Sequence, residues 1–151
     1  MKRSMLAVTF AAGCTAALQL VPAQAQFAKV EDAIKYRQSA YTVMSNHMGR
    51  LSAMARGTRP FDAAAAQSSA HIIEAMSHLP WEAFPPGSAT DKTRVKGDPW
   101  KDAAAFKKLQ EGLMAETAKL PGAVATLDGL KQQVGATGKA CKACHDDYRK
   151  D

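Results

Sequence analysis

Two cysteines and a histidine stand close together near the C-terminal end of the sequence. Residues 141–145 read Cys-Lys-Ala-Cys-His. Two thiols three positions apart, with an imidazole directly after the second, form the attachment signature of a c-type haem. Each thiol can form a thioether with a haem vinyl group, and His145 can then become an axial ligand of the iron. The pattern predicts one covalently bound haem c per chain, attached through Cys141 and Cys144.

Other interpretations of the same residues are weaker. A thioredoxin-like Cys-x-x-Cys pair needs a βαβ neighbourhood, and no run of residues here favours a strand. A structural zinc site needs four ligands, whereas the only other cysteine is Cys14 and the remaining histidines form no pair at zinc spacing. A disulfide would give no reason for the adjacent histidine. Haem attachment is therefore the favoured interpretation.

The first 25 residues have the pattern of a secretory signal peptide. Lys2 and Arg3 precede an apolar run at residues 5–12, and a small-x-small sequence ends at residue 25. The run is short and interrupted for a membrane span, and the lipoprotein-like sequence before Cys14 would leave a very short apolar region. We predict cleavage before Gln26, a single haem domain at 26–151, and a periplasmic location, since c-type haem is attached outside the bacterial cytoplasm.

The charge of the chain argues against nucleic acid as a partner. The formal net charge is +6, and residues 1–25 carry two of the 20 basic side chains and none of the 14 acidic ones, so the exported domain has +4. Two haem propionates would lower this to about +2. The charges are interspersed without a basic patch. The remaining positive charge leaves open whether the protein has acidic redox partners in the periplasm.

Four stretches have the apolar spacing of amphipathic helices, at about 29–56, 62–79, 98–120 and 127–148. Asp62 and the pair Asp98-Pro99 are good helix starts. A long connection at 80–97 separates the second and third helices. The spacing predicts an all-α, antiparallel four-helix bundle that encloses the haem. On the last helix, the two cysteines and His145 can reach the same haem.

The first two predicted helices each carry an apolar stripe. On the first helix the stripe runs through positions 30, 34, 37, 41, 44, 48, 51 and 55, and Arg37 interrupts it. This arginine could extend its head to water or turn inward to meet a carboxylate such as a haem propionate. The pattern alone leaves both open. On the second helix we expect a stripe of Ala65, Ile72, Met76 and Leu79.

Several segments together resemble the cytochrome c′ family. They are Gln26-Phe27-Ala28-Lys29, Lys35-Tyr36-Arg37-Gln38-Ser39-Ala40, Leu79-Pro80-Trp81-Glu82-Ala83-Phe84, Pro99-Trp100 and the sequence from Cys141 to Lys150. The resemblance covers essentially all of residues 26–151. It implies a five-coordinate iron with His145 on one face and an open face on the other. It also implies a homodimer formed through the first two helices.

The resemblance also implies roles for further residues. Tyr41 would stand at the open face with Phe84 as a second wall of the pocket, and Arg149 would lie near His145. Arg37 and Gln38 would lie next to the haem propionates. Thr93 and Arg94 would contact the haem from the long connection. The sequence after Thr93 lacks a proline that the family often has there.

Two functions remain from the residues. One is a gas-binding haem protein that binds nitric oxide or carbon monoxide at the open iron face. The other is an electron carrier, for which Met44, one turn beyond Tyr41, could supply a sixth ligand. No paired acid and base and no nucleophile with a partner are visible, so we do not interpret the chain as an enzyme.

Overall fold

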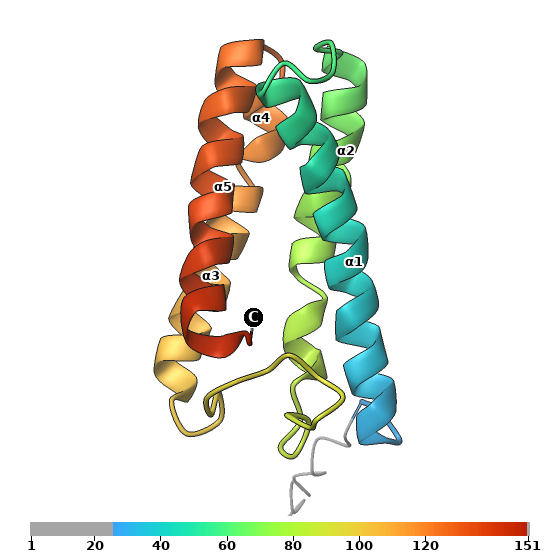
Figure 1. Cartoon of the computed structure of the whole chain (residues 1–151), viewed down its shortest axis with the longest axis vertical. Helices are drawn as coiled ribbons and strands as arrows, with labels where there is room; N and C mark the ends of the chain where they lie inside the picture. The colour runs from blue at the N-terminus through green and yellow to red at the C-terminus, as the bar shows by residue number, and fades with distance from the viewer. Residues whose placement is uncertain (1–25, 151) are drawn as a thin grey trace, which may run out of the picture.

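The four main helices lie side by side in a bundle (Figure 1). The computed structural model describes residues 26–150. Its long helices are α1 (Val30–Ala55), α2 (Ala63–Ser77), α3 (Ala103–Thr117) and α5 (Leu127–Tyr148), with a 3-10 turn η1 (Pro80–Ala83) and a short α4 (Leu120–Ala123) between them. Successive long helices run in opposite directions, with α1 beside α2 and α3 beside α5. The expected all-α, antiparallel four-helix bundle is confirmed.

The hydrophobic core fills the end of the bundle where α4 lies. Leu51 of α1, Ile73 of α2 and Leu130 of α5 are completely buried there, together with Leu120 and Val124 around α4. Large aliphatic side chains removed from water contribute roughly 1.5–3 kcal/mol each. This end therefore contributes much of the stability. The first part of α1 and the last part of α5 lie toward the other end (Figure 1).

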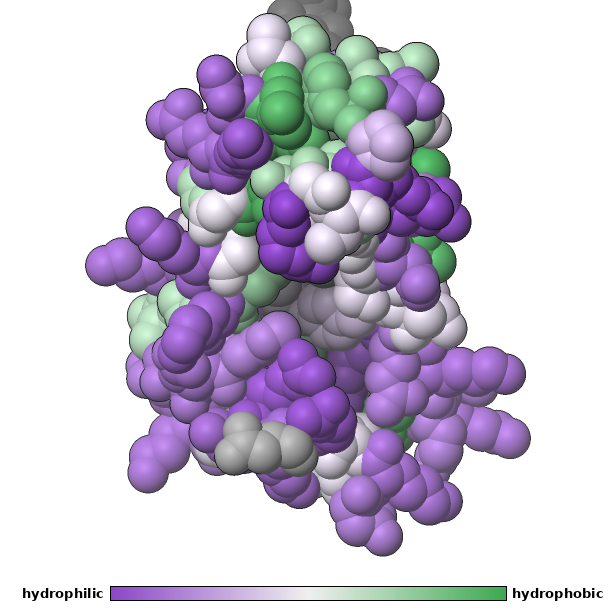
Figure 2. All heavy atoms as spheres, turned by 45° about the horizontal axis from the view of Figure 1, so that its top comes forward, coloured by the Kyte–Doolittle hydropathy of each residue, from purple (hydrophilic) through white to green (hydrophobic). Residues whose placement is uncertain are grey.

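The surface of the molecule is mainly polar on the face seen in Figure 2. Figure 2 shows one face as largely hydrophilic, with hydrophobic residues gathered at one end. Within residues 26–150, no helix is long and apolar enough to cross a membrane. The expected signal peptide, with Cys14, lies outside the described residues.

The third helix differs from its expected boundaries. Asp98 does cap backbone amides, accepting from Trp100 N at 3.1 Å and Lys101 N at 2.9 Å, but these close a separate turn. The regular helix begins only at Ala103. At its other end α3 stops at Thr117, and α4 begins at Leu120 with proline in its first turn, because Pro121 has no N–H with which to continue the ladder.

The buried stripe of α2 was also predicted wrongly. The fully buried positions are Ala66, Ser69, Ala70, Ile73 and Ser77, about one residue away from the expected set. Ala65 is exposed, and Ile72 and Met76 are half-buried. The small residues on this stripe allow α1 and α3 to approach α2 closely. The Ser77 hydroxyl donates to Glu74 O at 2.7 Å and accepts from Thr117 Oγ1 at 2.9 Å. Hydrophobic spacing alone cannot find a stripe that includes satisfied serines.

The long connection is ordered at both ends. Its first residues form η1, and its last residues pair with the segment after α5 through an isolated antiparallel bridge between Val95 and Arg149. Lys150 N donates to Arg94 O at 2.7 Å, and Lys96 N donates to Tyr148 O at 3.0 Å. Gly97 follows with φ of +69°, and a Cβ there would lie 3.3 Å from Asp147 O. Glycine at this position permits both the turn and the close approach to α5.

Candidate haem site

The two thiols and the imidazole lie on the last two turns of α5. Cys141 and Cys144 are free thiols, both half-buried, and Cys141 packs against the hydrophobic core cluster. Burial raises the pKa of Cys141, and burial together with Cys141 raises the pKa of Cys144 to about 11. Two neutral, neighbouring thiols beside an imidazole are the donor set that covalent haem attachment needs. The residues present therefore fit a haem.

Across from α5, helix α1 contributes Tyr41. Its phenol is half-buried, and its ring meets the Trp81 ring edge-on at 6.2 Å. Burial raises the pKa of Tyr41 well above its ordinary value, and nearby Cys144 raises it further, whereas Arg37 opposes the rise. The phenol therefore stays neutral, and Tyr41 and Cys141 both pack against the hydrophobic core cluster. The expected place of Tyr41 at the open face of the iron stays a prediction.

Arg37 is buried, with only 2% of its surface exposed, so the interpretation in which its head extends to water is wrong. Its Nη1 donates to Ala83 O at 2.7 Å and Ser88 Oγ at 2.8 Å, and its Nη2 donates to Ser88 O at 2.5 Å. The guanidinium carbon also lies 4.5 Å from the centre of the Phe84 ring. Arg37 therefore ties the long connection to α1. A guanidinium has five N–H groups, so two remain for other acceptors.

Aromatic rings pack against one another next to these residues. Phe84 packs against Phe106 at 5.1 Å and Trp81 at 6.4 Å, and Phe106 packs against Tyr148 of α5 at 4.9 Å. Edge-on and offset pairs at such distances are favourable beyond their area burial. The predicted wall residue Phe84 is thus held in a cluster that joins the connection, α3 and α5. Trp100 fixes it further by donating its Nε1 to Phe84 O at 2.7 Å.

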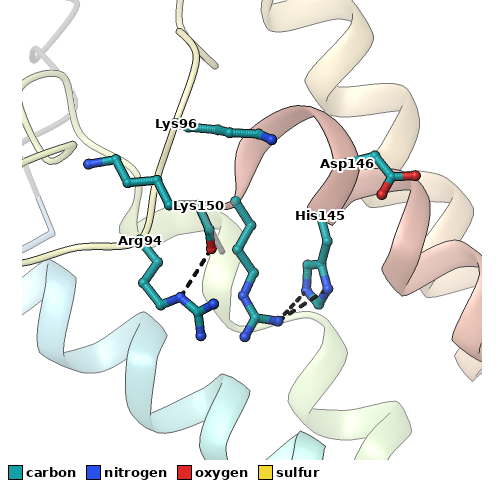
Figure 3. Close-up of a pocket in the computed structure, with 6 residues that line it drawn as sticks. Arg94, Lys96, His145, Asp146 and Lys150 are labelled. Atoms are coloured by element: carbon teal, nitrogen blue, oxygen red, sulfur yellow. Dashed lines mark hydrogen bonds between the residues drawn. The ribbon is translucent and has the colours of Figure 1, made fainter.

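On the other side of α5, His145 borders a polar pocket of about 260 Å³. Arg149 Nη1 lies 3.2 Å from His145 Nδ1 and 3.5 Å from Nε2 (Figure 3). Arg94, Lys96, Asp146 and Lys150 complete the lining. Burial, then Arg149 and Arg94, lowers the pKa of His145, so the imidazole is kept neutral. A neutral imidazole is the form that ligates iron.

The structure places the other three expected haem contacts in different surroundings. Gln38 follows Arg37 on α1, but its side chain is exposed while that of Arg37 is buried. Thr93 is buried and donates Oγ1 to Thr90 O at 3.0 Å. Arg94 is exposed, and its Nε donates to Lys150 O at 3.1 Å, so in this structure it contacts the segment after His145 (Figure 3).

Sequence reasoning missed Ser88 altogether. This serine is fully buried, and its Oγ accepts a hydrogen bond from the Arg37 guanidinium. It stands in a Pro-Pro-Gly-Ser turn, whose composition indicates a loop but no partner. Its role depends on a contact 51 residues away along the chain, so no local signal could have found it.

Comparisons with known proteins agree with the site. The family model described as cytochrome C′ matches residues 32–149. The cytochrome c′ of Rubrivivax gelatinosus is 46% identical over 129 residues, covering 82% of this chain and 98% of that protein. Its crystal structure aligns with a TM-score of 0.79 and covers 83% of this chain and all of that one. Structures of Alcaligenes xylosoxidans cytochrome c′ variants, one bound to carbon monoxide and one in complex with nitric oxide, are each 42% identical with TM-scores of 0.77. The first alignment covers 83% of this chain and 100% of that chain, and the second 83% and 99%.

The family model spans most of the chain, and these relatives share more than two fifths of their aligned residues with it. The spacing of the two thiols and the histidine, the four-helix bundle and the comparisons lead to the same assignment. The chain belongs to the cytochrome c′ family, and its cofactor is haem c bound covalently through cysteines.

Proposed function

We propose that this protein is a periplasmic haem protein that binds nitric oxide and carbon monoxide at an open face of a five-coordinate, high-spin iron, and that it buffers nitric oxide. The observation that carries the proposal is Tyr41 of α1, a neutral and half-buried phenol that packs against the same core cluster as Cys141 and is close enough to Cys144 for that thiol to raise its pKa. The carbon monoxide and nitric oxide complexes of the Alcaligenes xylosoxidans relatives support the choice of ligands.

The residues of α5 would hold the cofactor. Cys141 and Cys144 would form the thioethers, and His145 would supply a nitrogen ligand to the iron. Arg149, 3.2 Å from the His145 ring, would fix the orientation of the imidazole, and burial together with Arg149 lowers the pKa of His145. A group in contact with a ligating histidine commonly sets its orientation and basicity.

The residues of α1 and the long connection would shape the opposite face. Tyr41 and Phe84 wall a small apolar space, which admits diatomic gases and excludes larger or more polar ligands. Arg37 and Gln38 would lie on the propionate side, with Thr93 and Arg94 as further contacts from the connection. The two N–H groups of Arg37 that are not bonded to the loop are available to a carboxylate.

Haem supplies an iron centre that binds diatomic gases reversibly, and the chain controls access to it. A phenol ligates iron only as phenolate. Burial raises the pKa of Tyr41, which makes the phenolate costly at neutral pH. Tyr41 would therefore act by bulk alone, without forming a bond to iron and without transferring a proton.

The alternative of an electron carrier is less favoured by the geometry. Met44, the candidate sixth ligand, is 7% exposed and belongs to the hydrophobic core cluster with Leu51 and Ile73. Moving its sulfur toward α5 would disrupt that packing. We therefore propose gas binding rather than electron transfer or catalysis as the main activity.

We further propose that the protein is a homodimer through α1 and α2. Val43 of α1 is 40% exposed, which is unusual for a large hydrophobic residue within residues 26–150. Sedimentation of wild-type protein should give twice the chain mass, and Val43→Lys should shift the equilibrium toward monomer. A wild-type monomer at all concentrations would contradict the dimer.

Two measurements test the main proposal. Acidified acetone should leave the haem colour with the polypeptide, whereas Cys141→Ala combined with Cys144→Ala should release it. The ferric protein should have a high-spin absorption spectrum, and the ferrous protein should bind nitric oxide and carbon monoxide. A low-spin ferric spectrum, with no gas binding, would favour the electron carrier.

A further inference from the structure

The pocket beside the end of α5 gathers positive charge that the surrounding residues do not balance. It has a volume of about 260 Å³, and its lining consists of Arg94, Lys96, His145, Asp146, Arg149 and Lys150 (Figure 3). Four of these six side chains are cations and one is a carboxylate. Like charges that share one recess repel each other, and a counter-charge between them removes that cost. The lining therefore has the character of an anion site.

The antiparallel bridge between the long connection and the end of α5 brings the cations together. Lys150 N donates to Arg94 O at 2.7 Å, and Lys96 N donates to Tyr148 O at 3.0 Å. Residues two apart in an extended segment project to the same side, which places Arg94 and Lys96 on one side of the bridge. These positions are held by backbone hydrogen bonds, so a change of either lysine side chain leaves the bridge intact.

The carboxylate in the lining does not neutralise these cations. Both oxygens of Asp146 accept from Lys142 Nζ, at 2.7 and 2.6 Å. In Figure 3 the Asp146 side chain points away from those of Arg94 and Lys150. Within residues 26–150, none of the four lining cations forms an ion pair with a carboxylate. The positive charge of the pocket is therefore available to a ligand.

The chemical types of the cations indicate which anion fits. A guanidinium is a planar fork that matches two oxygens of an oxyanion, and an ammonium group donates to single oxygens. In the described part of the chain the Arg94 guanidinium uses only its Nε, which donates to Lys150 O at 3.1 Å. Both terminal nitrogens of Arg94 are thus free to bind oxygen atoms. A small ion with several oxygens can contact this fork and a lysine together.

We propose that this pocket binds a small oxyanion of the phosphate type between the cations of the bridge, next to His145. The bound ion lies beside the ring that borders the pocket, so in the haem-loaded protein its negative charge stabilises ferric over ferrous iron. Binding of the oxyanion does not depend on gas binding at the iron. Failure of either proposal therefore leaves the other standing.

Titration of the haem-loaded protein with inorganic phosphate, at an ionic strength held constant with sodium chloride, tests the site. Calorimetry should show saturable binding to wild type. Lys96→Gln should weaken it about fivefold, the effect of losing one exposed charge pair. Lys92→Gln removes the same charge from an exposed residue of the same connection that does not line the pocket, so it should change little.

Two results of this titration would overturn the proposal. One is the absence of saturable binding to wild type, whether a haem propionate or another carboxylate of the chain fills the pocket. The other is an equal effect of Lys96→Gln and Lys92→Gln, which would reduce the binding to general charge attraction. Binding to vesicles of an anionic phospholipid without binding to inorganic phosphate would also contradict a site for a small ion.

A third variant should change the affinity in the opposite direction. Asp146→Asn removes the carboxylate of the lining, so phosphate should bind more tightly than to wild type, a gain that a folding defect cannot produce. Phosphate should also lower the reduction potential of wild type more than chloride does at equal ionic strength, and Lys96→Gln should reduce this shift. Weaker binding to Asp146→Asn, or a potential that does not respond to phosphate, would show that the ion does not lie in this pocket.

Discussion

At the residue scale, the site depends on a few buried side chains whose polar atoms have defined partners. Arg37 shows this most clearly, because a guanidinium at 2% exposure needs every contact it can make. Burial lowers the pKa of Arg37, yet the three hydrogen bonds to the long connection keep the charged form satisfied. Tyr41 shows the opposite case, in which burial keeps a group uncharged.

Removing Arg37 should destabilise the protein and change the haem. Arg37→Ala leaves Ala83 O and Ser88 without their donor, which should lower the free energy of unfolding by about 2 kcal/mol or more. Loss of a positive charge beside a propionate should also lower the reduction potential. Arg50→Ala, on the exposed surface of the same helix, should change both values little. Unchanged stability and potential in Arg37→Ala would contradict both roles.

Shortening Tyr41 should open the ligand face. Tyr41→Ala should speed carbon monoxide binding to the ferrous protein about tenfold or more, equivalent to about 1.4 kcal/mol of barrier, while the ferric iron stays five-coordinate. Tyr41→Met should move the ferric spectrum toward a six-coordinate, low-spin form. Stopped-flow mixing and absorption spectra measure these effects, and Arg50→Ala on the same helix is the control. A phenolate charge-transfer band in wild-type protein at pH 7 would show instead that Tyr41 ligates iron.

At the element scale, polar contacts as well as apolar faces hold the helices in register. Gln133 of α5 is buried, and its Nε2 donates to Glu116 O at 2.9 Å and to Glu116 Oε2 at 2.8 Å of α3. Lys119 donates to the other carboxylate oxygen at 2.7 Å. These contacts connect α3 to α5 near the start of the helix that carries the thiols.

The Glu116 contacts should make stability depend on pH. Hydrogen bonds from Lys119 and Gln133 hold the pKa of Glu116 below its ordinary value near 4.5. A carboxyl whose pKa is lower when folded contributes stability above the unfolded pKa and loses it as the pH falls through the folded pKa. Glu116→Gln should therefore flatten the fall in thermal midpoint between about pH 5 and pH 3. Glu111→Gln, in an exposed pair with Lys107, is the control, and equal acid sensitivity in both variants would argue against this linkage.

The sequence predicted which helices exist better than it predicted where α3 begins or which distant residues are in contact. Regular spacing over many residues identifies α1 and α5, whose observed bounds differ from expectation by one or two residues at most. The start of α3 was missed because Asp98 can cap an isolated turn as well as a helix, and its contacts to Trp100 and Lys101 show only the turn. Contacts between distant segments, such as Arg37 with Ser88 and Val95 with Arg149, leave no periodic trace.

At the scale of the whole molecule, the bundle divides into two ends with different tasks. The end at α4 is filled by aliphatic side chains such as Leu120 and Leu130, while the other end carries the thiols, aromatic rings and buried arginine. A cofactor covalently attached to α5 and walled by α1 would therefore connect the two helix pairs at that end.

Export should define the start of the purified protein. We expect intact mass spectrometry to give residues 26–151 plus one haem, with Gln26 first and Cys14 removed. The small-x-small sequence before Gln26 is the reason for this cleavage site. Expression without the first 25 residues should abolish haem attachment, because the thiols would stay in the cytoplasm. A mass that retains Cys14, with or without a lipid, would contradict both the cleavage and the location.

The bridge between residues 94–96 and 148–150 has a dynamic consequence. Helix ends normally fray, and their last amides exchange rapidly with solvent. Here the amides of Lys96 and Lys150 are bonded across the two segments at 3.0 and 2.7 Å, so the last turn of α5 cannot loosen without releasing the connection. Both amides should exchange slowly and at similar rates. Lys96→Pro, which removes one of these donors, should speed exchange at Lys150, whereas Lys96→Ala should not. The long connection, which includes Phe84, and the last turn of α5, which carries His145, would then move as one cooperative unit. Binding of a gas on one face of the iron would therefore change the position of His145 on the other face.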